Sequence, residues 1–493
     1  MGHIRSYIPM AQDLRVLRTV VLVLAALFLP TAGGASQTAQ AGAPEITCDA
    51  IPPSACDTTV VAMLRDDYGV GFSANNRVVL FKRGTEKFAD LFCAIRQARH
   101  SIHCEYFNFR NDSISKALFT LLAEKAAEGV EVRVLFDGFG NSSNNRPLRR
   151  SHLKRLRASG IEIYEFDPVR FPWFNHVLHR DHRKIVVIDG CVAYTGGMNV
   201  ADYYLKGKPE FGEWRDIHAR IEGDAVGKLQ AVFIGFWNKV TGQDVSGSQY
   251  YPGTRDAARL FSGLAPDTCS TSGHKYVAVV DRTPGRSDRI IHDTFVKAID
   301  GARSQIQIIN PYFTLCGHIR RALIRAARRG VDVEVMLSAK SDIPITPRIV
   351  EYNAHKLMEQ GVNIYFFEGG FHHSKIMMVD SLYAFIGSAN LNSRSLSFDY
   401  ECNLLVADRP TTATLQRIFE TDKVTRCFKL TPQTWRKMSL WRRFSGWLFH
   451  FLAPVVSRDS GDSERLGDFH HSEPLFVRNF LSCETLHFPS ARP

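Results

Sequence analysis

Two short stretches of the chain carry the same chemically active side chains at the same spacing. Each reads histidine, one intervening residue, lysine, four intervening residues and aspartate. These residues are His182, Lys184 and Asp189 in the first stretch, and His373, Lys375 and Asp380 in the second. Each stretch is followed by a glycine-containing segment that ends in an asparagine, Asn199 after the first and Asn390 after the second. A single histidine near a strand is most often structural, but a matched pair in the same order indicates a catalytic set.

The spacing places histidine and lysine on one face at the start of each expected strand (184–189 and 375–380), because alternate side chains of a strand share a face. If the two halves pack about a pseudo-two-fold axis, two imidazoles and two ammonium groups converge on one pocket. The lysines and the amides of Asn199 and Asn390 would then hold a phosphate group by charge and hydrogen bonds. We therefore predict phosphoryl chemistry, with one histidine on each side of the phosphorus.

Histidine can fill two roles in such a reaction, because its ordinary pKa of ~6.5 lies close to working pH. One deprotonated imidazole would attack phosphorus. The other, protonated, would donate to the leaving oxygen and later deprotonate the incoming acceptor. The lysines and amides already stabilise the charge, so no metal and no other cofactor is expected.

Four further residues are expected to support this set. Asp216 and Glu401 lie at equivalent points after the two motifs, where a carboxylate could orient an imidazole and fix its tautomer. The alternative for each is a partly exposed carboxylate on a strand. Gly197 and Ser388 stand in the glycine-containing segments, two residues before the asparagines. The two motif aspartates also have an alternative, since they end the expected strands and could cap the following turns.

The motifs belong to a longer internal duplication, which predicts two equivalent structural units. EGVEVRVLFDG (128–138) resembles RGVDVEVMLSA (329–339), and SGIEIYEFDP (159–168) resembles QGVNIYFFEG (360–369). The segments follow one another in the same order in both halves. The internal duplication therefore extends well beyond the two histidine motifs.

Local patterns within the repeats favour alternating helices and strands. Helical apolar spacing over 113–129 precedes an apolar run at 130–136, and the segments 319–330 and 331–337 repeat that arrangement. The expected fold class is α/β, with two duplicated α/β/α sandwich units packed around a pseudo-two-fold axis and one shared active site. The expected limits of the two units are 75–245 and 270–425.

Charge and the N-terminal segment narrow the choice of partner. A net charge of +11 predicts an acidic partner, namely nucleic acid, an anionic lipid surface or a phosphorylated substrate. Arg15 and Arg18 precede an apolar run from Val20 to Leu29, and small residues follow, which is typical of a secretory signal peptide. The run is short for a bilayer span, which needs ~20 residues. Residues 1–36 are expected to be a signal peptide or a membrane anchor.

The C-terminal part of the chain holds a second segment of interest for membranes. Residues 435–455 combine Trp435, Trp441 and Trp447 with clustered arginine and lysine. Such a combination suits an interfacial helix on anionic lipid, and a helix of the second unit's core is the alternative. The remaining residues, 456–493, are expected to form a polar tail.

The paired HxKxxxxD motifs resemble those of the phospholipase D superfamily, and the surrounding segments, such as GSANLNSRSLSFDYECNLLV, look most like bacterial cardiolipin synthases. The resemblance implies a phosphohistidine intermediate and transfer of a phosphatidyl group from one phosphatidylglycerol to another, giving cardiolipin and glycerol. By analogy His182 is the nucleophile and His373 the acid/base. The resemblance also implies a place at the bacterial inner membrane, with phospholipid and an anionic membrane surface as partners.

Three other functions fit part of the pattern. A phospholipid-hydrolysing phosphodiesterase would use the same chemistry with water as acceptor, and a nuclease would use the basic charge. The signal-like N-terminus and the tryptophan-rich segment have no obvious use on DNA, so no nucleic-acid partner is expected. An inactive lipid-binding scaffold would be expected to lack part of one motif, and both are intact. The acceptor and the oligomeric state are left open by the sequence.

Overall fold

The computed structural model describes residues 56–169, 178–252, 274–343 and 345–456. The expected signal or anchor segment (1–36) lies outside these ranges, as does the expected polar tail from residue 457 onward. Over the residues that are described, no helix is both long enough and apolar enough to cross a bilayer.

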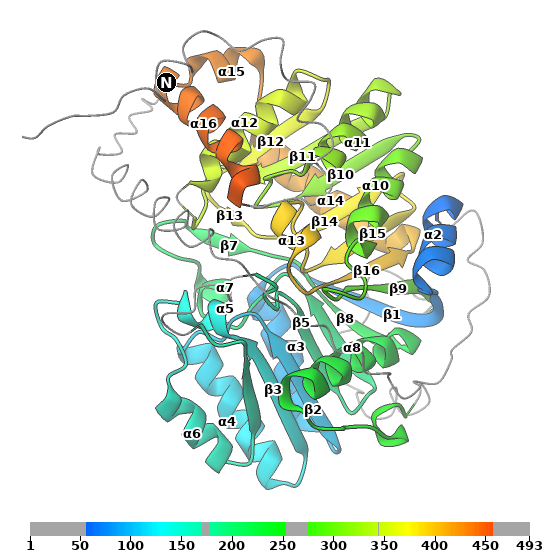
Figure 1. Ribbon diagram of the computed structural model, residues 1–493, viewed down its shortest axis with the longest axis vertical. Coiled ribbons are helices and arrows are strands. Elements are labelled where there is room, and N and C mark those ends of the chain that lie inside the picture. The colour runs from blue at the N-terminus through cyan, green and yellow to red at the C-terminus, as the bar shows by residue number, and fades with distance from the viewer. Residues whose placement is uncertain (1–55, 170–177, 253–273, 344, 457–493) are drawn as a thin grey trace, which may run out of the picture. The chain divides into compact units, whose positions relative to one another are not determined.

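A single mixed sheet of fifteen strands runs through the described part of the chain (Figure 1). One half of the sheet, from its centre outwards, consists of β1 (Ser73–Phe81), β8 (His218–Gly223), β6 (Val192–Gly196), β5 (Lys184–Ile188), β2 (Ser101–Tyr106), β3 (Glu131–Asp137) and β4 (Glu162–Phe166). The other half consists of β9 (Lys275–Arg282), β16 (Glu401–Ala407), β15 (Tyr383–Gly387), β14 (Ile376–Val379), β10 (Gln305–Ile309), β11 (Asp332–Ser338), β12 (Asn363–Phe367) and β17 (Cys427–Lys429). Apart from β17, each strand of one half has its counterpart at the same place in the other, so the duplication and the α/β class are confirmed.

The helix–strand pairs expected from the repeats are present. Helix α4 (Ser113–Ala127) connects the parallel strands β2 and β3, and helix α11 (Gly317–Arg328) connects β10 and β11 in the same way. Parallel neighbours require such a crossover, because a tight turn reverses the chain. The motif strands β5 and β14 pair antiparallel with β2 and β10, and every residue of both is buried. Continuous apolar runs in these strands are therefore explained by burial on both faces.

The two sheets that were expected as separate units are joined into one. Strands β1 and β9 pair antiparallel, with Ser73 opposite Val277 and Asn76 opposite Lys275, and an irregularity between them. The side chain of Asn76 donates to the backbone oxygen of Lys275 (2.9 Å) and accepts from the backbone N–H of Ala225 (2.8 Å). This pairing leaves neither half with an open edge at the centre, where unpaired backbone groups would be costly.

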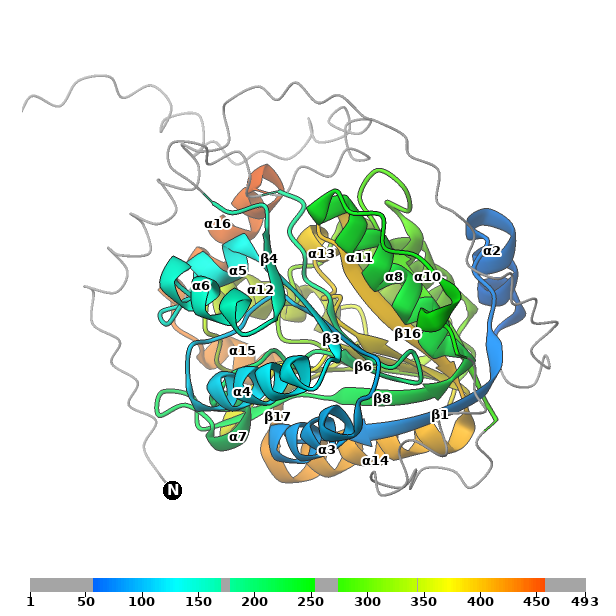
Figure 2. The same cartoon turned by 90° about the horizontal axis from the view of Figure 1, so that it is seen from below.

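Helices cover both sides of the sheet, and the two halves contribute to each side (Figure 2). The helices concerned are α3 (Gly84–Gln97), α8 (Asp224–Thr241), α10 (Ile290–Gly301) and α14 (Arg409–Arg426). Helices α8 and α14 pack on one face of the sheet, and α3 and α4 of the first half and α10 and α11 of the second half pack on the opposite face. One apolar cluster includes Leu229 of α8, Phe419 of α14, and residues of β5 and β14. The halves therefore share part of their core and do not fold as independent bodies.

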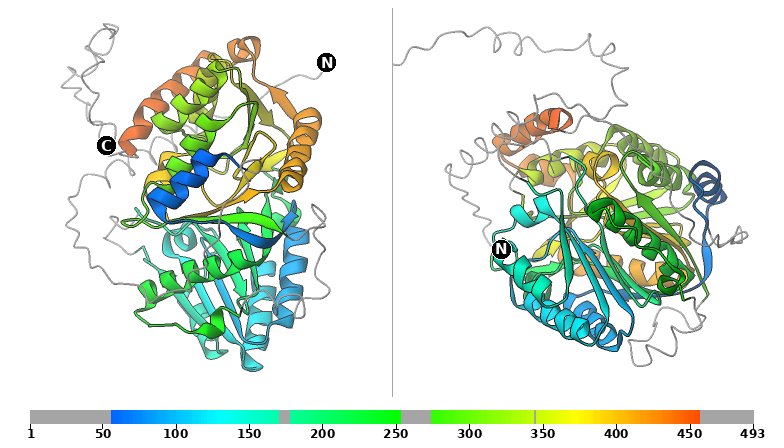
Figure 3. Two further views of the ribbon diagram at one scale, coloured as in Figure 1. Left: turned by 90° about the vertical axis from the view of Figure 1, so that its right-hand side faces the viewer. Right: turned by 60° about the horizontal axis from the view of Figure 1, so that its bottom comes forward.

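A helix that precedes the first repeat packs against the second one. Helix α2 (Thr58–Tyr68) lies beside α10, as Figures 1 and 3 show. Val60 and Leu64 belong to the apolar core of the second half, and the hydroxyl of Tyr68 donates to Asp293 Oδ2 at 2.6 Å. The sequence patterns gave no sign of this contact, because α2 lies far from its partner in the chain.

Each motif aspartate stands just after its strand and holds the backbone of the segment that leads into the neighbouring strand, β2 or β10. The carboxylate of Asp189 accepts the backbone N–H groups of Arg99, His100 and Ser101 at 2.8–2.9 Å. Asp380 accepts three backbone N–H groups of the corresponding segment, Arg303 to Gln305, at 2.7–3.0 Å. Both aspartates have positive φ, 51° and 52°, a conformation that aspartate and asparagine tolerate better than most residues.

The variants Asp189→Asn and Asp380→Asn test this role. Asparagine keeps the backbone conformation but loses the charge and one acceptor, so each variant should lose ~1–3 kcal/mol of unfolding free energy, measured by urea denaturation. Turnover per folded molecule should stay within a few-fold of the unchanged protein. A large loss of turnover with unchanged stability would instead place the carboxylates in the chemistry.

Candidate functional site

The two motif histidines are anchored to the backbone of the opposite half. The N–H of His182 donates to the oxygen of Tyr400 at 3.0 Å, next to a parallel bridge between Asp181 and Tyr400. The N–H of His373 donates to the oxygen of Arg215 at 2.6 Å. His373 directly follows strand β13 (Gly370–His372), which pairs in parallel with β7 (Glu213–Arg215) of the first half. These two crossings bring the motifs together at the junction of the repeats.

Each histidine also makes a side-chain contact with a carboxylate from the opposite half. His182 Nδ1 lies 2.9 and 3.1 Å from the two oxygens of Glu401. His373 Nδ1 lies 2.8 Å from Asp216 Oδ2. Both carboxylates are buried, with exposures of 0% and 1%, so neither is a partly exposed strand residue. Engagement of Nδ1 holds the ring in one orientation and leaves Nε2 as the nitrogen that can face a substrate.

The residues beside the carboxylates fit them in two different ways. A Cβ at Gly197 would overlap the oxygens of Asp216, so this position accepts only glycine as long as Asp216 stays in place. The equivalent residue, Ser388, donates its hydroxyl to Glu401 Oε2 and accepts the N–H of Cys402 at 3.0 Å. Asp216 therefore lies beside Gly197 and Glu401 lies beside Ser388, so the shorter carboxylate side chain has the smaller neighbour.

The motif lysines lie in the same buried cluster. Lys184 and Lys375 each donate to the backbone oxygen of the histidine of their own motif, and Lys375 Nζ lies 3.1 Å from His373 Nδ1. Burial lowers the pKa of Lys184 to about 8 and that of Lys375 to about 7, although the nearby carboxylates oppose this. Two ammonium groups close together in a buried site favour an anion between them.

The motif asparagines supply polar groups that the protein itself leaves unsatisfied. Asn199 and Asn390 are 6% and 4% exposed. Among the described residues, neither Oδ1 atom has a hydrogen-bond partner. Buried amide groups are normally paired, so an unpaired one at each equivalent position fits a site whose remaining partner is a ligand.

Burial and neighbouring charges give the two histidine–carboxylate pairs different protonation. Burial raises the pKa of Glu401, but the charge of His182 and its hydrogen bond outweigh this and bring it to about 2. Burial raises the pKa of Asp216 to about 7, with the lysines opposing. Burial lowers the pKa of both histidines, and that of His373 falls well below its ordinary value because both lysines and His182 add to the effect. The first pair is thus a neutral imidazole beside an ionised carboxylate, and the second binds one shared proton near neutral pH.

Aromatic side chains surround the cluster, and the sequence analysis did not identify them. The ring of Phe107 lies 5.1 Å from that of His182. The rings of Trp214 and Tyr312 lie 5.8 and 5.7 Å from that of His373, and the hydroxyl of Tyr204 lies 3.4 Å from its Nδ1. Trp214 and Tyr312 come from different halves of the chain, and only the packing of distant segments brings them to one histidine.

A third buried lysine lies near the same cluster. Lys87 is fully buried in α3 and donates to the hydroxyl of Tyr106 at 2.9 Å. Burial lowers the pKa of Lys87 to about 7, and the charge of Asp216 opposes this. The sequence pattern could not identify Lys87 as part of the site, because helical spacing predicts only that a position is buried and not what it contacts.

Two equivalent acceptors hold the segments that carry the asparagines. His218 Nδ1 accepts the N–H of Met198 at 3.4 Å, and Asn403 Oδ1 accepts the N–H of Ala389 at 3.1 Å. Each donor directly precedes a motif asparagine. These residues too were missed, since the contact is made across neighbouring strands.

The structure does not bring Asp189 and Asp380 into the cluster. Each lies past the far end of its motif strand, five residues from the motif lysine, which corresponds to ~16 Å in an extended chain. Their carboxylates accept backbone N–H groups of the segments that lead into β2 and β10. This geometry supports a structural role, and their expected place among the catalytic residues stays a prediction.

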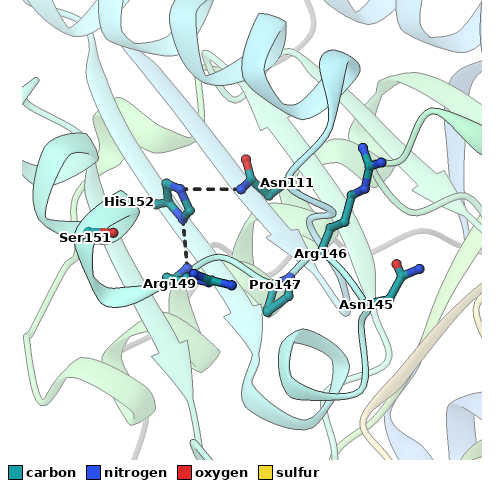
Figure 4. Close-up of a pocket in the computed structure, with 7 residues that line it drawn as sticks. All are labelled: Asn111, Asn145, Arg146, Pro147, Arg149, Ser151 and His152. Carbon is teal, nitrogen blue, oxygen red and sulfur yellow. Dashed lines mark hydrogen bonds between the residues drawn. The ribbon is translucent and has the colours of Figure 1, made fainter.

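A surface hollow of about 440 Å³ lies elsewhere, between the start of α6 (Arg150–Ala158) and the loop before it (Figure 4). Its histidine, His152, is already engaged on both ring nitrogens, by Asn111 at 3.4 Å and by the N–H of Arg149 at 3.0 Å. No motif residue lines it. Among the described residues there is also no group of three or more metal-ligating side chains, so the paired cluster is the candidate site.

Comparison with known proteins gives one consistent result. Residues 91–215 and 295–423 match the family described as "Cardiolipin synthase, PLD-like domain". The chain is 34% identical to Cardiolipin synthase 2 of Staphylococcus epidermidis, over 80% of this chain and 78% of that protein. It is 32% identical to the cardiolipin synthase of Listeria monocytogenes, over 80% and 79%. The fold resembles that of the phosphatidylserine synthase of Haemophilus influenzae, with a TM-score of 0.59, 14% identity, and coverage of 81% of this chain and 97% of that one.

The variant Gly197→Ala tests the placement of the second pair. The added Cβ would push Asp216 away from His373, and a displacement of this size should lower turnover by ~10²-fold. Ser388→Ala is the matched control at the equivalent position, because it adds no atoms and removes only the hydrogen bonds that the hydroxyl makes with Glu401 and with the N–H of Cys402, for which ~10-fold is expected. Full turnover in Gly197→Ala would contradict the arrangement.

Proposed function

The chain belongs to the phospholipase D-like family of cardiolipin synthases, which are phosphatidyltransferases, and on that premise we propose that it joins two phosphatidylglycerol molecules to give cardiolipin and glycerol. The observation that carries the proposal is the pair of histidines, each held at Nδ1 by a buried carboxylate of the opposite half. Two such groups at one phosphate site suit a reaction in two steps. A covalent intermediate with the first lipid forms before the second lipid reacts, so the two lipids need not react directly with each other.

In the first step, Nε2 of His182 attacks the phosphorus of one phosphatidylglycerol. The bond from phosphorus to the glycerol headgroup breaks, and His373 donates a proton to the leaving oxygen, so glycerol departs. The ring of His182 becomes a phosphorylated imidazolium, whose positive charge lies beside the ionised carboxylate of Glu401. Lys184 and Lys375 balance the charge on the phosphate oxygens.

In the second step, a headgroup hydroxyl of the second phosphatidylglycerol attacks the phosphohistidine. His373, now unprotonated, accepts the proton of that hydroxyl, and the bond from phosphorus to His182 breaks. Cardiolipin forms, and both histidines return to their starting states. The assignment of His182 as nucleophile is supported by its neutral ring beside an ionised carboxylate, and that of His373 as acid/base by the proton it shares with Asp216 near neutral pH.

The proposed function also implies where in the cell the enzyme acts. Its substrates are phospholipids, so it acts at the cell membrane, and the apolar N-terminal segment serves as an export signal or an anchor. Support comes from the similarity to the named cardiolipin synthases and from the basic charge of the chain.

The direct test is incubation of the purified protein with phosphatidylglycerol labelled in its glycerol headgroup and its acyl chains. Cardiolipin with release of one glycerol per product is expected. Formation of phosphatidic acid instead would make the protein a hydrolase, because water would then be the acceptor. Breakdown of DNA with no change in lipid would overturn the proposal altogether.

The nucleophile is tested with His182→Ala, His373→Ala and the control His100→Ala, whose side chain is exposed. Both motif variants should lose at least ~10³-fold in turnover, and the control should lose nothing. After denaturation at alkaline pH, where the nitrogen–phosphorus bond of a phosphohistidine survives, the His373 variant should still hold a labelled phosphatidyl group and the His182 variant should not. The reverse pattern would exchange the two roles.

The pH profile of kcat/KM should be bell-shaped. The acid limb should lie below the ordinary histidine pKa of ~6.5, because burial lowers the pKa of His182 and so keeps it unprotonated. The alkaline limb should lie between about 7 and 8, where Asp216, Lys375 and Lys184 lose their protons. Lys375→Arg keeps its charge at all these pH values and should move the alkaline limb upward; an unchanged limb would remove this lysine from the titration.

A further inference from the structure

Helix α16 (Leu440–Val456) lies on the outside of the second half (Figures 1 and 3). Leu440, Trp441, Phe444 and Trp447 are 77%, 59%, 49% and 42% exposed. The rings of Trp441 and Phe444 lie 6.0 Å apart, and those of Phe444 and Trp447 lie 5.7 Å apart. These four residues, here called the α16 face, stand at helical spacing and form one continuous apolar patch.

The opposite side of α16 is fixed to helix α12 (Thr346–Met358), so the orientation of the α16 face is determined. A Cβ at Gly446 would come within 2.7 Å of the backbone oxygen of Arg348, which shows how closely the helices approach. Arg442 Nε donates to Glu351 Oε2 at 2.8 Å, and Ser445 is buried. The helix therefore cannot turn its apolar face inward without breaking these contacts.

The surroundings of the α16 face are basic. From Pro432 to Val456 the chain has four basic residues, Arg436, Lys437, Arg442 and Arg443, and no acidic one. Arg442 is neutralised by Glu351, whereas Arg436 and Lys437 are exposed. Tryptophan and phenylalanine next to exposed cations match the interface of an anionic bilayer, where the rings enter the headgroup region and the cations meet phosphate.

The extent of the α16 face argues against a second copy of the chain as its partner. Aromatic side chains bury ~150–250 Å² each, so at these exposures the four residues offer on the order of 500 Å². A stable dimer buries ~800 Å² on each partner. The patch is of the size that marks a functional surface on a single molecule.

We propose that the α16 face inserts into the surface of a bilayer that contains anionic phospholipid and holds the enzyme there while it works. The inference rests on the proposed function, because it gives the enzyme access to lipid substrates without requiring that they leave the bilayer. Of the three tryptophans that suggested an interfacial segment, Trp435 is buried and stacks on His355 at 4.1 Å. The apolar part of the surface therefore begins at Leu440, and the exposed Arg436 and Lys437 before it contribute charge.

The test uses the full chain and tryptophan quenching by vesicles of brominated phosphatidylglycerol. This measurement reports the insertion of this face even if another segment also holds the protein on the vesicle. The face variant is Leu440→Ser/Trp441→Ser/Phe444→Ser, in which Trp447 remains as reporter. The matched control is Val424→Ser, since Val424 of α14 is 79% exposed but lies outside the patch.

The unchanged protein and the control should be quenched equally, and the face variant should lose most of the quenching. A charge variant, Arg436→Glu/Lys437→Glu, should need at least ~10-fold more lipid for the same quenching, with a smaller difference at high salt. Equal quenching of the face variant and the unchanged protein would overturn the proposal. So would a face variant that changes only the oligomeric state in sedimentation, which would assign the face to a second copy of the chain.

Kinetics separate this inference from the proposed function. The face variant should turn over phosphatidylglycerol in vesicles at least ~10-fold more slowly, but should act normally on a short-chain phosphatidylglycerol dissolved as monomers. If the unchanged protein forms no cardiolipin from either substrate, the proposed function fails while the quenching result stands. If the face variant keeps full activity on vesicles, the α16 face is not what holds the enzyme at its substrate.

Discussion

Each histidine of the site is held by a carboxylate that belongs to the other half of the chain, and the rest of the structure serves this crossed contact. Glu401 reaches His182, and Asp216 reaches His373. Neither half could therefore complete its own histidine–carboxylate pair. The continuous sheet, the pairing of β7 with β13 and the shared apolar cluster keep the halves in one fixed relation, because a shift of even 1 Å between them would disturb both pairs at once.

Burial gives these contacts their chemical meaning. In water, an imidazole and a carboxylate would each titrate near their ordinary values, and the two pairs would behave alike. In the interior, the surroundings of each carboxylate decide its protonation. Burial raises the pKa of Glu401, but the charge and hydrogen bond of His182, with Lys184 and the hydroxyl of Ser388, outweigh this and keep Glu401 ionised, while burial moves the pKa of Asp216 to about 7. The duplication thus supplies two copies of one arrangement, and the differences between the copies suit the two different roles that we propose for them.

Much of this could be predicted from local patterns. The repeated spacing placed His182 and Lys184 together because alternate residues of a strand share a face, and helical periodicity placed α4 and α11 directly before the strands β3 and β11. The same reasoning grouped Asp189 and Asp380 with the histidines, since it counts residues along the chain and not the distance they span. It also missed Lys87, Tyr204 and His218, because a buried polar residue on an apolar face carries no periodic signal, and it gave no reason for α2 to pack against the second half.

The sequence by itself determined the residue types of the site, their order and their duplication, because these follow from identity and spacing alone. It also determined the α/β class, since periodicity reflects which face of each element is buried. Only the tertiary structure decided that the carboxylates exchange between halves, that the two sheets join at β1 and β9, and that the aromatic residues of α16 face outward while Trp435 faces inward. These features depend on contacts between segments tens to hundreds of residues apart, whose energies come from packing and pairing in three dimensions and leave no trace in local spacing.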